Sequence, residues 1–259
     1  MKIKIMTLFP HFYDQFMTSS IIGRAQALGQ VTIETVNIRD YSLDKNHRVD
    51  THPIGGGAGL IMRMEPLVDC LKANTTEKTH KILLGPKGHP YQQKDAIRLS
   101  RLDEICLICG HYEGIDARFS DYVDEEISIG DFILTGGEIP AMAITDSIVR
   151  LLKGVIADDS TQEESFNGTI LEYPQYTYPD EYEGKKIPSV LYSGNHKVIE
   201  EYQRREALRE TYEKRPDLLE RMTYSKKDAE IIRNLKNGVS EIQTEEEKDA
   251  ILKGKKFIH

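Results

Sequence analysis

Short apolar runs alternate with stretches of helical apolar spacing over the first 157 residues of the chain. The short runs are typical of buried strands, and they predict strands at 2–8, 31–37, 81–84, 105–109 and 126–134. Helical spacing between the runs predicts helices at 11–17, 20–28, 65–73, 91–100, 116–122 and 138–152. Because strands and helices alternate, we expect an α/β domain.

The pattern changes after residue 157. Residues 158–183 hold eight acidic residues and no lysine or arginine, and they show no sustained periodicity. This composition predicts a linker between domains. Helical spacing returns at 196–213, 216–221, 225–237 and 244–252. We therefore expect an α/β domain over 1–157, an acidic linker over 158–183 and a small all-helical domain over 184–259.

Three apolar runs are followed by turns that contain glycine, at 85–88, 110–116 and 128–140. Glycine lets the main chain approach a ligand closely, and the carboxyl ends of parallel strands meet at one edge of a sheet. We therefore expect the three turns to form one pocket. They match neither the phosphate-binding loop G-x-x-x-x-G-K-[ST] nor G-x-G-x-x-G at a helix start, which argues against those two nucleotide sites.

Composition narrows the class of protein. The chain has 259 residues, of which 39% are hydrophobic, and it contains no run of 18 apolar residues that could span a membrane. The N-terminus lacks the long apolar region of a signal peptide, so we expect a cytoplasmic protein without a membrane partner. Three cysteines argue against a disulfide framework. Cys106 and Cys109 lie three apart in a predicted strand and face opposite ways, so we expect buried thiols rather than a shared metal ion.

The net charge of −8 is unfavourable for a nucleic-acid-binding protein, but the charge is unevenly distributed. Residues 184–259 hold 17 basic and 14 acidic residues, so this part is mildly basic. Arg205 and Arg209 lie four apart, on one face of a predicted helix. This arrangement is compatible both with an RNA contact and with a solvated helix face, and the two interpretations stay open.

Eleven motifs occur in an order and spacing that are specific in combination. They are Leu8-Phe9-Pro10, Gly23-Arg24-Ala25, Arg39-Asp40, Val49-Asp50, Gly55–Gly59, Tyr112–Asp116, Ser128–Pro140, Asp146-Ser147 with Arg150, Glu164-Ser165-Phe166, Pro174–Thr177 and Ser193–His196. Together they resemble the bacterial tRNA (guanine-N1)-methyltransferase family. The resemblance implies the SPOUT fold, an α/β domain with a deep trefoil knot, and a homodimer whose active sites lie between the subunits.

The resemblance also implies the reaction and the cofactor. A methyl group would pass from S-adenosylmethionine to N1 of guanine at tRNA position 37, beside the anticodon. The three glycine turns would hold the cofactor mainly through their main chain. The candidate cofactor-binding residues are Leu84, Gly85, Pro86, Gly110, Tyr112, Glu113, Ile129, Gly130, Asp131, Phe132, Ile133, Leu134, Gly136, Gly137 and Pro140.

Neutral guanine carries a proton on N1, so this chemistry needs a base near N1 and a cation near O6. By motif position, the resemblance assigns Arg150 to the O6 side and Glu164 to the base. The family commonly has aspartate where this chain has Glu164, and Glu163, Asp159 and Asp158 stay open as alternatives. Magnesium can assist charge stabilisation in this family, but the sequence shows no ligand cluster for it.

The same resemblance names candidate RNA contacts, which are Arg24, Asp50, His52, Ser193, Asn195 and His196. The chain departs from the family at His111, at Thr51-His52 and at Tyr178, where Arg, Asp-Arg and Arg are common. We expect these departures to affect tRNA affinity more than chemistry.

The glycine-rich loop Gly55–Gly59 is interpreted either as a cover for the pocket or as a plain loop. Two alternative functions stay open, a sister knotted RNA methyltransferase with another target and a tRNA-binding protein without catalysis. No DNA partner is expected.

Overall fold

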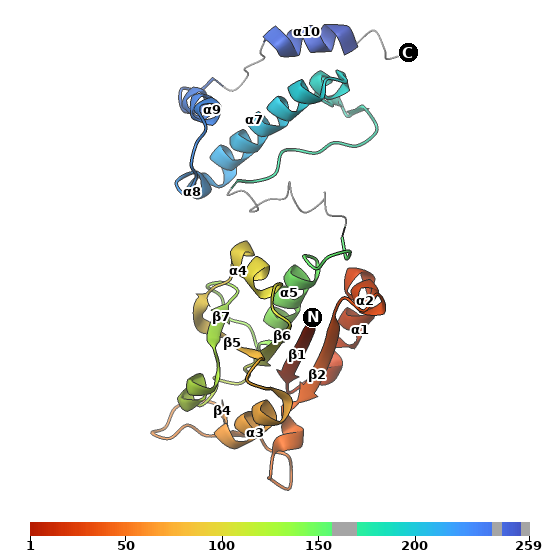
Figure 1. Ribbon diagram of the computed structural model, residues 1–259. Coiled ribbons are helices and arrows are strands. Elements are labelled where there is room, and N and C mark those ends of the chain that lie inside the picture. The colour runs from red at the N-terminus through yellow and green to blue at the C-terminus, as the bar shows by residue number, and fades with distance from the viewer. Residues whose placement is uncertain (157–169, 240–244, 255–259) are drawn as a thin grey trace. The chain divides into compact units, whose positions relative to one another are not determined.

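The computed structural model describes residues 1–156, 170–239 and 245–254. Contacts divide the chain into two compact units, Met1–Asp158 and Asp159–His259, and each unit is described by itself. The first unit combines a central sheet with covering helices, and helices dominate the second (Figure 1). The predicted three-part division of the chain stays a prediction.

A five-stranded sheet forms the centre of the first unit, in the order β2-β1-β6-β5-β7. All neighbouring strands in it are parallel, which confirms the predicted α/β class. Its strands are β1 (Lys2–Thr7), β2 (Thr32–Asn37), β5 (His80–Pro90), β6 (Glu104–Cys109) and β7 (Glu125–Ser128). The strand predicted over 126–134 is wrong beyond Ser128, because Gly130 takes a φ of 151° that does not continue a strand.

Helices cover both faces of the sheet, and most of them lie where the spacing predicts. They are α1 (Asp14–Thr18), α2 (Ser20–Ala27), α3 (Met64–Asn74), α4 (Gln93–Leu99) and α5 (Glu138–Val149). The helix predicted over 116–122 is instead a 3-10 helix, Ala117–Tyr122, whose start is capped by the Asp116 carboxylate accepting from the Arg118 N–H. A small antiparallel pair, β3 (Asp50–Thr51) and β4 (Ile61–Met62), lies outside the main sheet.

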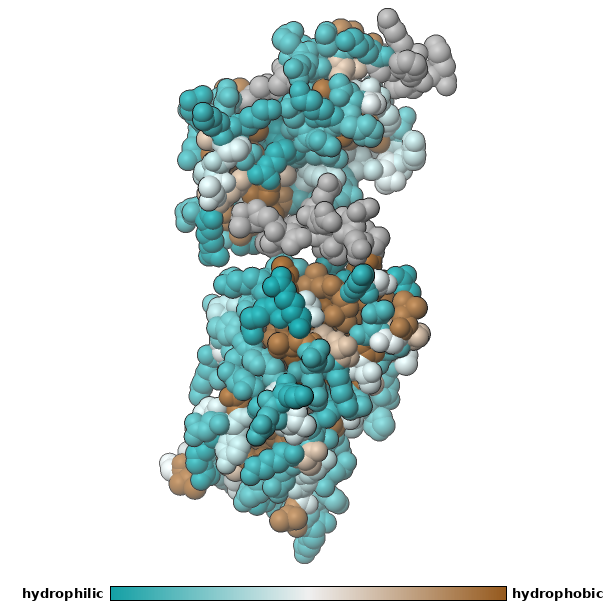
Figure 2. Space-filling model, viewed as in Figure 1, coloured by the Kyte–Doolittle hydropathy of each residue, from teal (hydrophilic) through white to brown (hydrophobic). Residues whose placement is uncertain are grey.

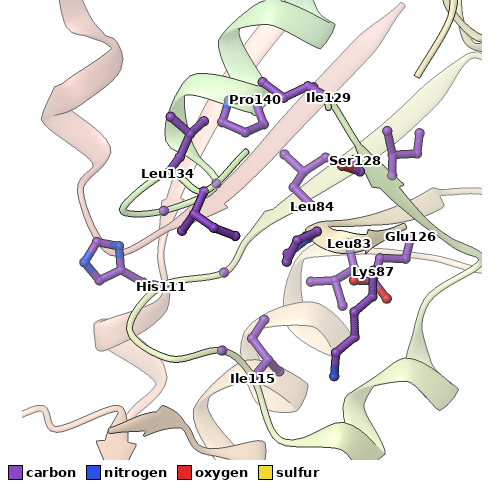
Figure 3. A pocket seen from close by; sticks show the side chains of 18 of the residues that line it. Leu83, Leu84, Lys87, His111, Ile115, Glu126, Ser128, Ile129, Leu134 and Pro140 are labelled. Atoms are coloured by element: carbon purple, nitrogen blue, oxygen red, sulfur yellow. The ribbon is translucent and has the colours of Figure 1, made fainter. Parts of the chain in front are cut away.

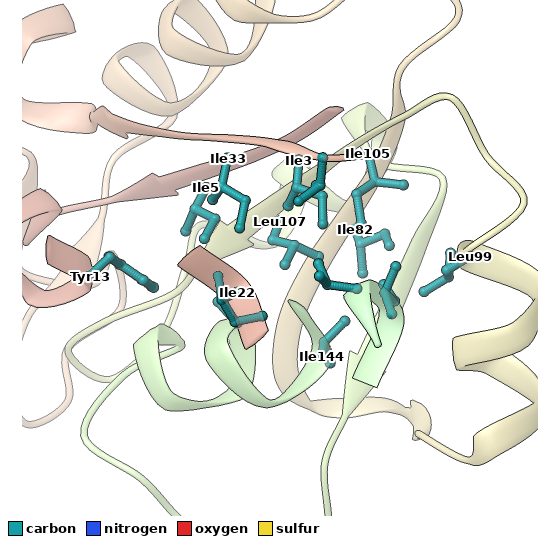
Figure 4. Packing of buried hydrophobic residues seen from close by; sticks show 14 of the residues in the cluster. Ile3, Ile5, Tyr13, Ile22, Ile33, Ile82, Leu99, Ile105, Leu107 and Ile144 are labelled. Carbon is teal, nitrogen blue, oxygen red and sulfur yellow. The ribbon is translucent and has the colours of Figure 1, made fainter. Parts of the chain in front are cut away.

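The sheet buries apolar side chains on both faces. Ile3 and Ile5 pack with α2 and α5 on one face (Figure 4), and Met6 packs with α3 on the other. The same alternation places Cys109 in the first cluster and Cys106 in the second, both fully buried and free, which confirms the predicted buried thiols. Burial raises the pKa of Cys106 to about 12, so this thiol stays protonated at neutral pH.

The second unit is built around one long helix. Its elements are α7 (His196–Lys214), α8 (Pro216–Leu219), α9 (Lys226–Lys236), α10 (Glu245–Gly254) and a hairpin of β8 (Glu181–Tyr182) with β9 (Lys185–Lys186). The helices lie where the spacing predicts them, within a few residues. The hairpin was not predicted, and it means that residues 184–259 are not purely helical. Leu208 and Ile232 form part of the cluster between α7 and α9.

Candidate active site

A cavity of about 690 Å³ lies at one edge of the sheet, beside β5, β6 and β7. The first glycine segment, 85–88, does not follow its strand as predicted. It lies inside β5, where the pairing with β7 shifts register between Leu84 and His89. The other two turns follow β6 and β7, which flank β5, so all three segments meet at this edge. Figure 3 shows side chains from all three turns around the cavity, among them Leu84, Ile115 and Leu134. The predicted convergence of the three glycine turns is therefore present in the fold.

Fourteen of the fifteen candidate cofactor residues line this cavity. Asp131 is the exception, because it does not belong to the lining although both of its neighbours do. The lining residues that sequence reasoning did not select are Leu83, Lys87, His111, Gly114, Ile115, Asp116, Ala117, Ser120, Glu126, Ile127, Ser128 and Thr135. Most of these adjoin selected residues in the same turns, so including each complete turn would have found them.

Glu126 lies in β7 and not in a turn, so including each complete turn would not have found it. It reaches the cavity through the pairing of β5 with β7, in which Leu83 lies opposite Glu126. A Cβ atom on Gly85 would lie 2.6 Å from Glu126 Oε1, so the carboxylate occupies the space next to that glycine. Strand register decides this contact.

Two glycines close the inner wall of the cavity. The Gly137 N–H donates to the Gly110 carbonyl at 2.8 Å, and a Cβ atom on Gly137 would lie 2.7 Å from Cys109 Cα. A Cβ atom on Gly136 would lie 2.5 Å from His111 Nδ1. Any side chain at either position would therefore push the third turn away from the second.

Glu138 begins α5 and is buried directly behind these glycines. Its Oε1 accepts a hydrogen bond of 2.8 Å from the Thr7 hydroxyl, and its Oε2 lies 3.9 Å from His111 Nδ1. The Tyr13 hydroxyl donates to the Glu138 carbonyl at 3.4 Å. Burial, with smaller contributions from Cys109 and Glu138, raises the pKa of Tyr13, so the hydroxyl remains a donor. The carboxylate thus anchors the third turn to β1.

An aromatic row borders the cavity. The His111 ring makes edge-to-face contacts with Phe9 and Tyr112, at centroid distances of 5.1 and 5.0 Å. Tyr112 has a φ of 60°, which turns the chain sharply after β6, and Arg39 Nη2 donates to its hydroxyl at 3.3 Å. Burial and then the nearby Asp50 carboxylate raise the pKa of Tyr112. Asp50, a candidate RNA contact, therefore lies at this wall.

The glycine-rich loop Gly55–Gly59 is attached to the second turn. The Glu113 N–H donates to the Leu60 carbonyl at 3.0 Å, and the Met62 N–H donates to the Gly114 carbonyl at 2.9 Å. A Cβ atom on Gly59 would meet the Glu113 side chain. The loop thus lies beside the cavity wall, and its role as a cover stays a prediction.

Of the two candidate catalytic residues, only Arg150 lies in the part of the chain that the structure describes. Arg150 is the residue that ends α5, it is half-buried, and it does not belong to the cavity lining. Glu164 and its alternatives Glu163, Asp159 and Asp158 lie outside the described residues. The structure therefore brings the candidate cofactor residues together and leaves Arg150 outside the lining of the cavity.

The candidate RNA contacts are scattered. Arg24 Nη2 donates to the Val155 carbonyl, so this guanidinium holds the chain after α5. The exposed His52 lies 3.3 Å from the Gly59 carbonyl through Nδ1.

In the second unit the candidates Ser193 and Asn195 have structural roles at the start of α7. The Asn195 N–H donates to Ser193 Oγ, and Asn195 Oδ1 accepts from the Val198 N–H as the N-cap. His196 is the first residue of α7 and is exposed. These contacts account for the Ser193–His196 motif as a helix start without excluding a further role.

Within the described residues, no group of three His, Cys, Asp or Glu side chains could hold a metal ion. In the same part of the chain, no helix has both the length and the apolar character needed to cross a membrane.

A parallel sheet with glycine segments around a cavity at one edge defines an α/β protein with a candidate ligand site at that edge. A model of the family "tRNA (Guanine-1)-methyltransferase TrmD" matches residues 1–221, and the chain belongs to this family.

Individual relatives have the same assignment. A tRNA (guanine-N(1)-)-methyltransferase of Clostridium perfringens (strain SM101 / Type A) is 49% identical over 236 residues, covering 90% of this chain and 100% of the relative. Proteins of that name from Dictyoglomus turgidum (strain DSM 6724 / Z-1310) and Staphylococcus aureus (strain JH9) are 46% and 45% identical, covering 93% and 92% of this chain and 99% of each relative. These names do not favour either alternative function.

Proposed function

We propose that this protein transfers a methyl group from S-adenosylmethionine to N1 of guanine in tRNA, at position 37. Family membership over residues 1–221 supports the reaction, and the cavity built by three glycine turns is the observation that carries it. Its volume of about 690 Å³ lies in the range of small-molecule sites.

The residues of the cavity fit S-adenosylmethionine. Gly136 and Gly137 leave main chain bare at the wall, and Leu84, Leu134 and Pro140 offer apolar surface for an adenine ring. Glu113 is suited to the ribose hydroxyls or to the amino group. When bound, S-adenosylmethionine supplies an electrophilic methyl group on a positively charged sulfur.

The acceptor side of the reaction depends on two charged side chains. A carboxylate, which we propose is Glu164, accepts the N1 proton of the guanine, and the negative charge that this leaves spreads to O6. The Arg150 guanidinium stabilises that charge at O6. Alignment of N1 with the methyl group is then a matter of orientation, which the tRNA contacts provide.

A homodimer would complete this site. Pro140, in the first turn of α5, lines the cavity, whereas Arg150 lies at the other end of the same helix. Ten helical residues rise by about 15 Å, farther than an arginine side chain extends, so we propose that Arg150 acts in the cavity of the partner subunit. Phe132, Ile133 and Ile139 expose apolar surface that a second copy would bury. Figure 2 shows further apolar residues gathered on the first unit around α2 and α5.

Co-expression of two inactive variants tests this shared site. A Gly137→Ala subunit would lack a working cavity, and an Arg150→Ala subunit would lack the cation. If Arg150 acts across the interface, the mixed dimer contains one intact site, and about a quarter of wild-type activity returns. If Arg150 acts within its own subunit, the mixture stays inactive.

We also propose the SPOUT trefoil knot for the first unit and a tRNA-binding role for the second. The chain leaves β7 at the sheet edge and returns to the centre, where Gly137 bonds Gly110 and α5 packs against β1 and β6. Passage of this return segment through the preceding turns would make the knot. No group of side chains among the described residues could hold a magnesium ion, and no step of the proposed reaction is assigned to magnesium.

A methyl-transfer assay tests the function directly. Labelled S-adenosylmethionine is given with two tRNA transcripts, one with guanosine and one with adenosine at position 37. Label on the first alone, unaffected by a 2′-O-methyl group at that nucleotide, would support base methylation at this position. Label on neither transcript, with cofactor binding intact, would contradict it.

A further inference from the structure

Helix α10 lies beyond residues 1–221, which the family model matches. The relative from Clostridium perfringens is covered along its whole length by 90% of this chain, so about a tenth of the chain has no counterpart in it. Within the second unit, α10 packs on α7 and on the 3-10 helix Ser189–Tyr192. It therefore lies on the longest helix of the unit.

The first turn of α10 is acidic and contacts two cations of α7. Glu247 Oε1 accepts a hydrogen bond of 2.6 Å from Arg205 Nη1, and the two side chains are only 3% and 13% exposed. Glu246 Oε2 lies 3.8 Å from Lys197 Nζ at the start of α7. The Arg205 guanidinium also lies 5.4 Å from the centre of the Tyr202 ring.

Each lysine and arginine of α7 has a carboxylate partner. Arg204 pairs with Asp228 of α9, while Arg209 and Lys214 pair with Glu206 and Glu210 of α7 itself. Only Lys197 and Arg205 are paired to α10. If α10 moved away, Lys197 would lose its partner, and Arg205 would keep only Glu206 of α7, whose Oε1 lies 3.9 Å from Arg205 Nε.

The apolar contact that holds α10 in place is small. Ala250 and Ile251 pack with Val190, Val198 and Tyr202. Ala250 is small and Ile251 is only half-buried, so little apolar area holds this ten-residue helix. The nearly enclosed pair of Arg205 with Glu247 is therefore the main polar contact that holds α10, whereas Lys197 and Glu246 are 71% and 66% exposed and their pair adds little.

We propose that α10 is an acidic cover that competes with tRNA phosphates for Lys197 and Arg205. This inference rests on the proposed tRNA-binding role of the second unit. Lys197 directly follows the Ser193–His196 motif, so the first of the two cations lies beside the candidate RNA contacts. A tRNA phosphate and a carboxylate cannot both bind the same guanidinium or ammonium group at once. Binding of phosphates to Lys197 and Arg205 therefore displaces Glu246 and Glu247, and α10 with them.

The test measures binding of a tRNA transcript to the full-length protein between 50 and 200 mM salt. The double variant Glu246→Gln, Glu247→Gln weakens the cover, and we expect it to bind several-fold more tightly than the wild type. Because up to two cations become available, the slope of log K against log salt should steepen by about one to two. The control is Glu245→Gln, Asp249→Asn, which removes the same charge from exposed positions of α10.

Equal or weaker binding by the first variant would overturn the proposal, and so would the same gain in the control. Binding by the wild type without methyl transfer would instead count against the proposed function.

A second variant tests the cover without removing charge. Cysteines introduced by Val198→Cys and Ala250→Cys, which share one cluster, would lock α10 onto α7 when oxidised. The native cysteines are all buried in the first unit. We expect the oxidised protein to bind tRNA several-fold more weakly than the reduced one, with cross-linking checked by mass spectrometry. Equal affinity of the two forms would overturn the proposal.

Discussion

The Thr7 hydroxyl donates a hydrogen bond of 2.8 Å to Glu138 Oε1, between residues 131 positions apart in the chain. Both side chains are buried, Thr7 at the end of β1 and Glu138 at the start of α5. The bond therefore ties the third turn of the cavity to the centre of the sheet.

Replacing Thr7 by valine keeps the shape of the side chain but removes the donor. The Glu138 carboxylate then stays buried with one partner fewer, which should lower the free energy of unfolding by about 1 to 3 kcal/mol. Urea denaturation followed by circular dichroism measures the loss. Thr32→Val, at an exposed position of β2, is the matched control and should change stability little. Equal losses in the two variants would show that the hydroxyl of Thr7 contributes nothing specific.

Gly137→Ala should abolish cofactor binding while leaving most of the fold intact. The new Cβ atom would lie 2.7 Å from Cys109 Cα, so the third turn must move and the cavity closes or distorts. Calorimetric titration with S-adenosylmethionine measures the effect. Gly29→Ala serves as the control, because its φ of 69° imposes strain in open space and this glycine does not line the cavity. If both variants bind the cofactor normally, the cavity described here is not its site.

Glu164→Gln should bind S-adenosylmethionine normally and lose methyl transfer by about 10² to 10⁴-fold, the usual contribution of a general base. The amide keeps the size of the side chain but cannot take a proton from guanine N1. Single-turnover assays with tRNA measure the chemical step. Glu163→Gln is the neighbouring control. Loss of activity in the control alone would move the base to Glu163.

The contacts of Glu125 predict that the folded protein loses stability in acid. Burial opposes its ionisation, but hydrogen bonds from Arg98 and His80 hold the pKa of this carboxyl below its usual range. A depressed pKa stabilises the folded state above the unfolded value of about 4.3, and this stabilisation is lost as pH falls through the folded pKa. Urea midpoints between pH 6 and pH 3 should therefore fall less steeply in Glu125→Gln than in the wild type.

The control for that series is Glu34→Gln, whose carboxylate pairs with Lys2 at an exposed site. Surface pairs of this kind contribute little, so the pH dependence should match the wild type. Identical profiles for all three proteins would mean that the contacts of Glu125 do not stabilise the fold.

Local patterns predicted much of the first unit. Apolar runs located the five strands of the sheet, and the period of two correctly placed Cys106 and Cys109 on opposite faces. Predicted strand 126–134 extended too far because its apolar residues continue past Gly130, where the backbone conformation ends the strand. The helix over 116–122 was predicted from spacing alone, which does not distinguish an α-helix from the tighter 3-10 form.

The candidate site likewise combines features that the sequence predicted with features that depend on the fold. The glycine turns were recognisable because each follows an apolar run in the sequence, and neighbouring parallel strands bring such segments together. Glu126 was not assigned to the cavity, since its position depends on the pairing of β5 with β7. Motif position assigned Arg150 to the catalytic residues. Only the fold shows that Arg150 does not line the cavity of its own chain.

The sequence by itself determined the alternation of strands and helices, the three glycine turns and the family, because these depend on residue order and local spacing. The tertiary structure decided which distant residues meet, such as Thr7 with Glu138, Gly85 with Glu126, and Arg205 with Glu247. Such contacts arise from strand register and helix packing, in which many weak interactions act together. No local pattern carries that information, because each partner lies tens of residues away along the chain.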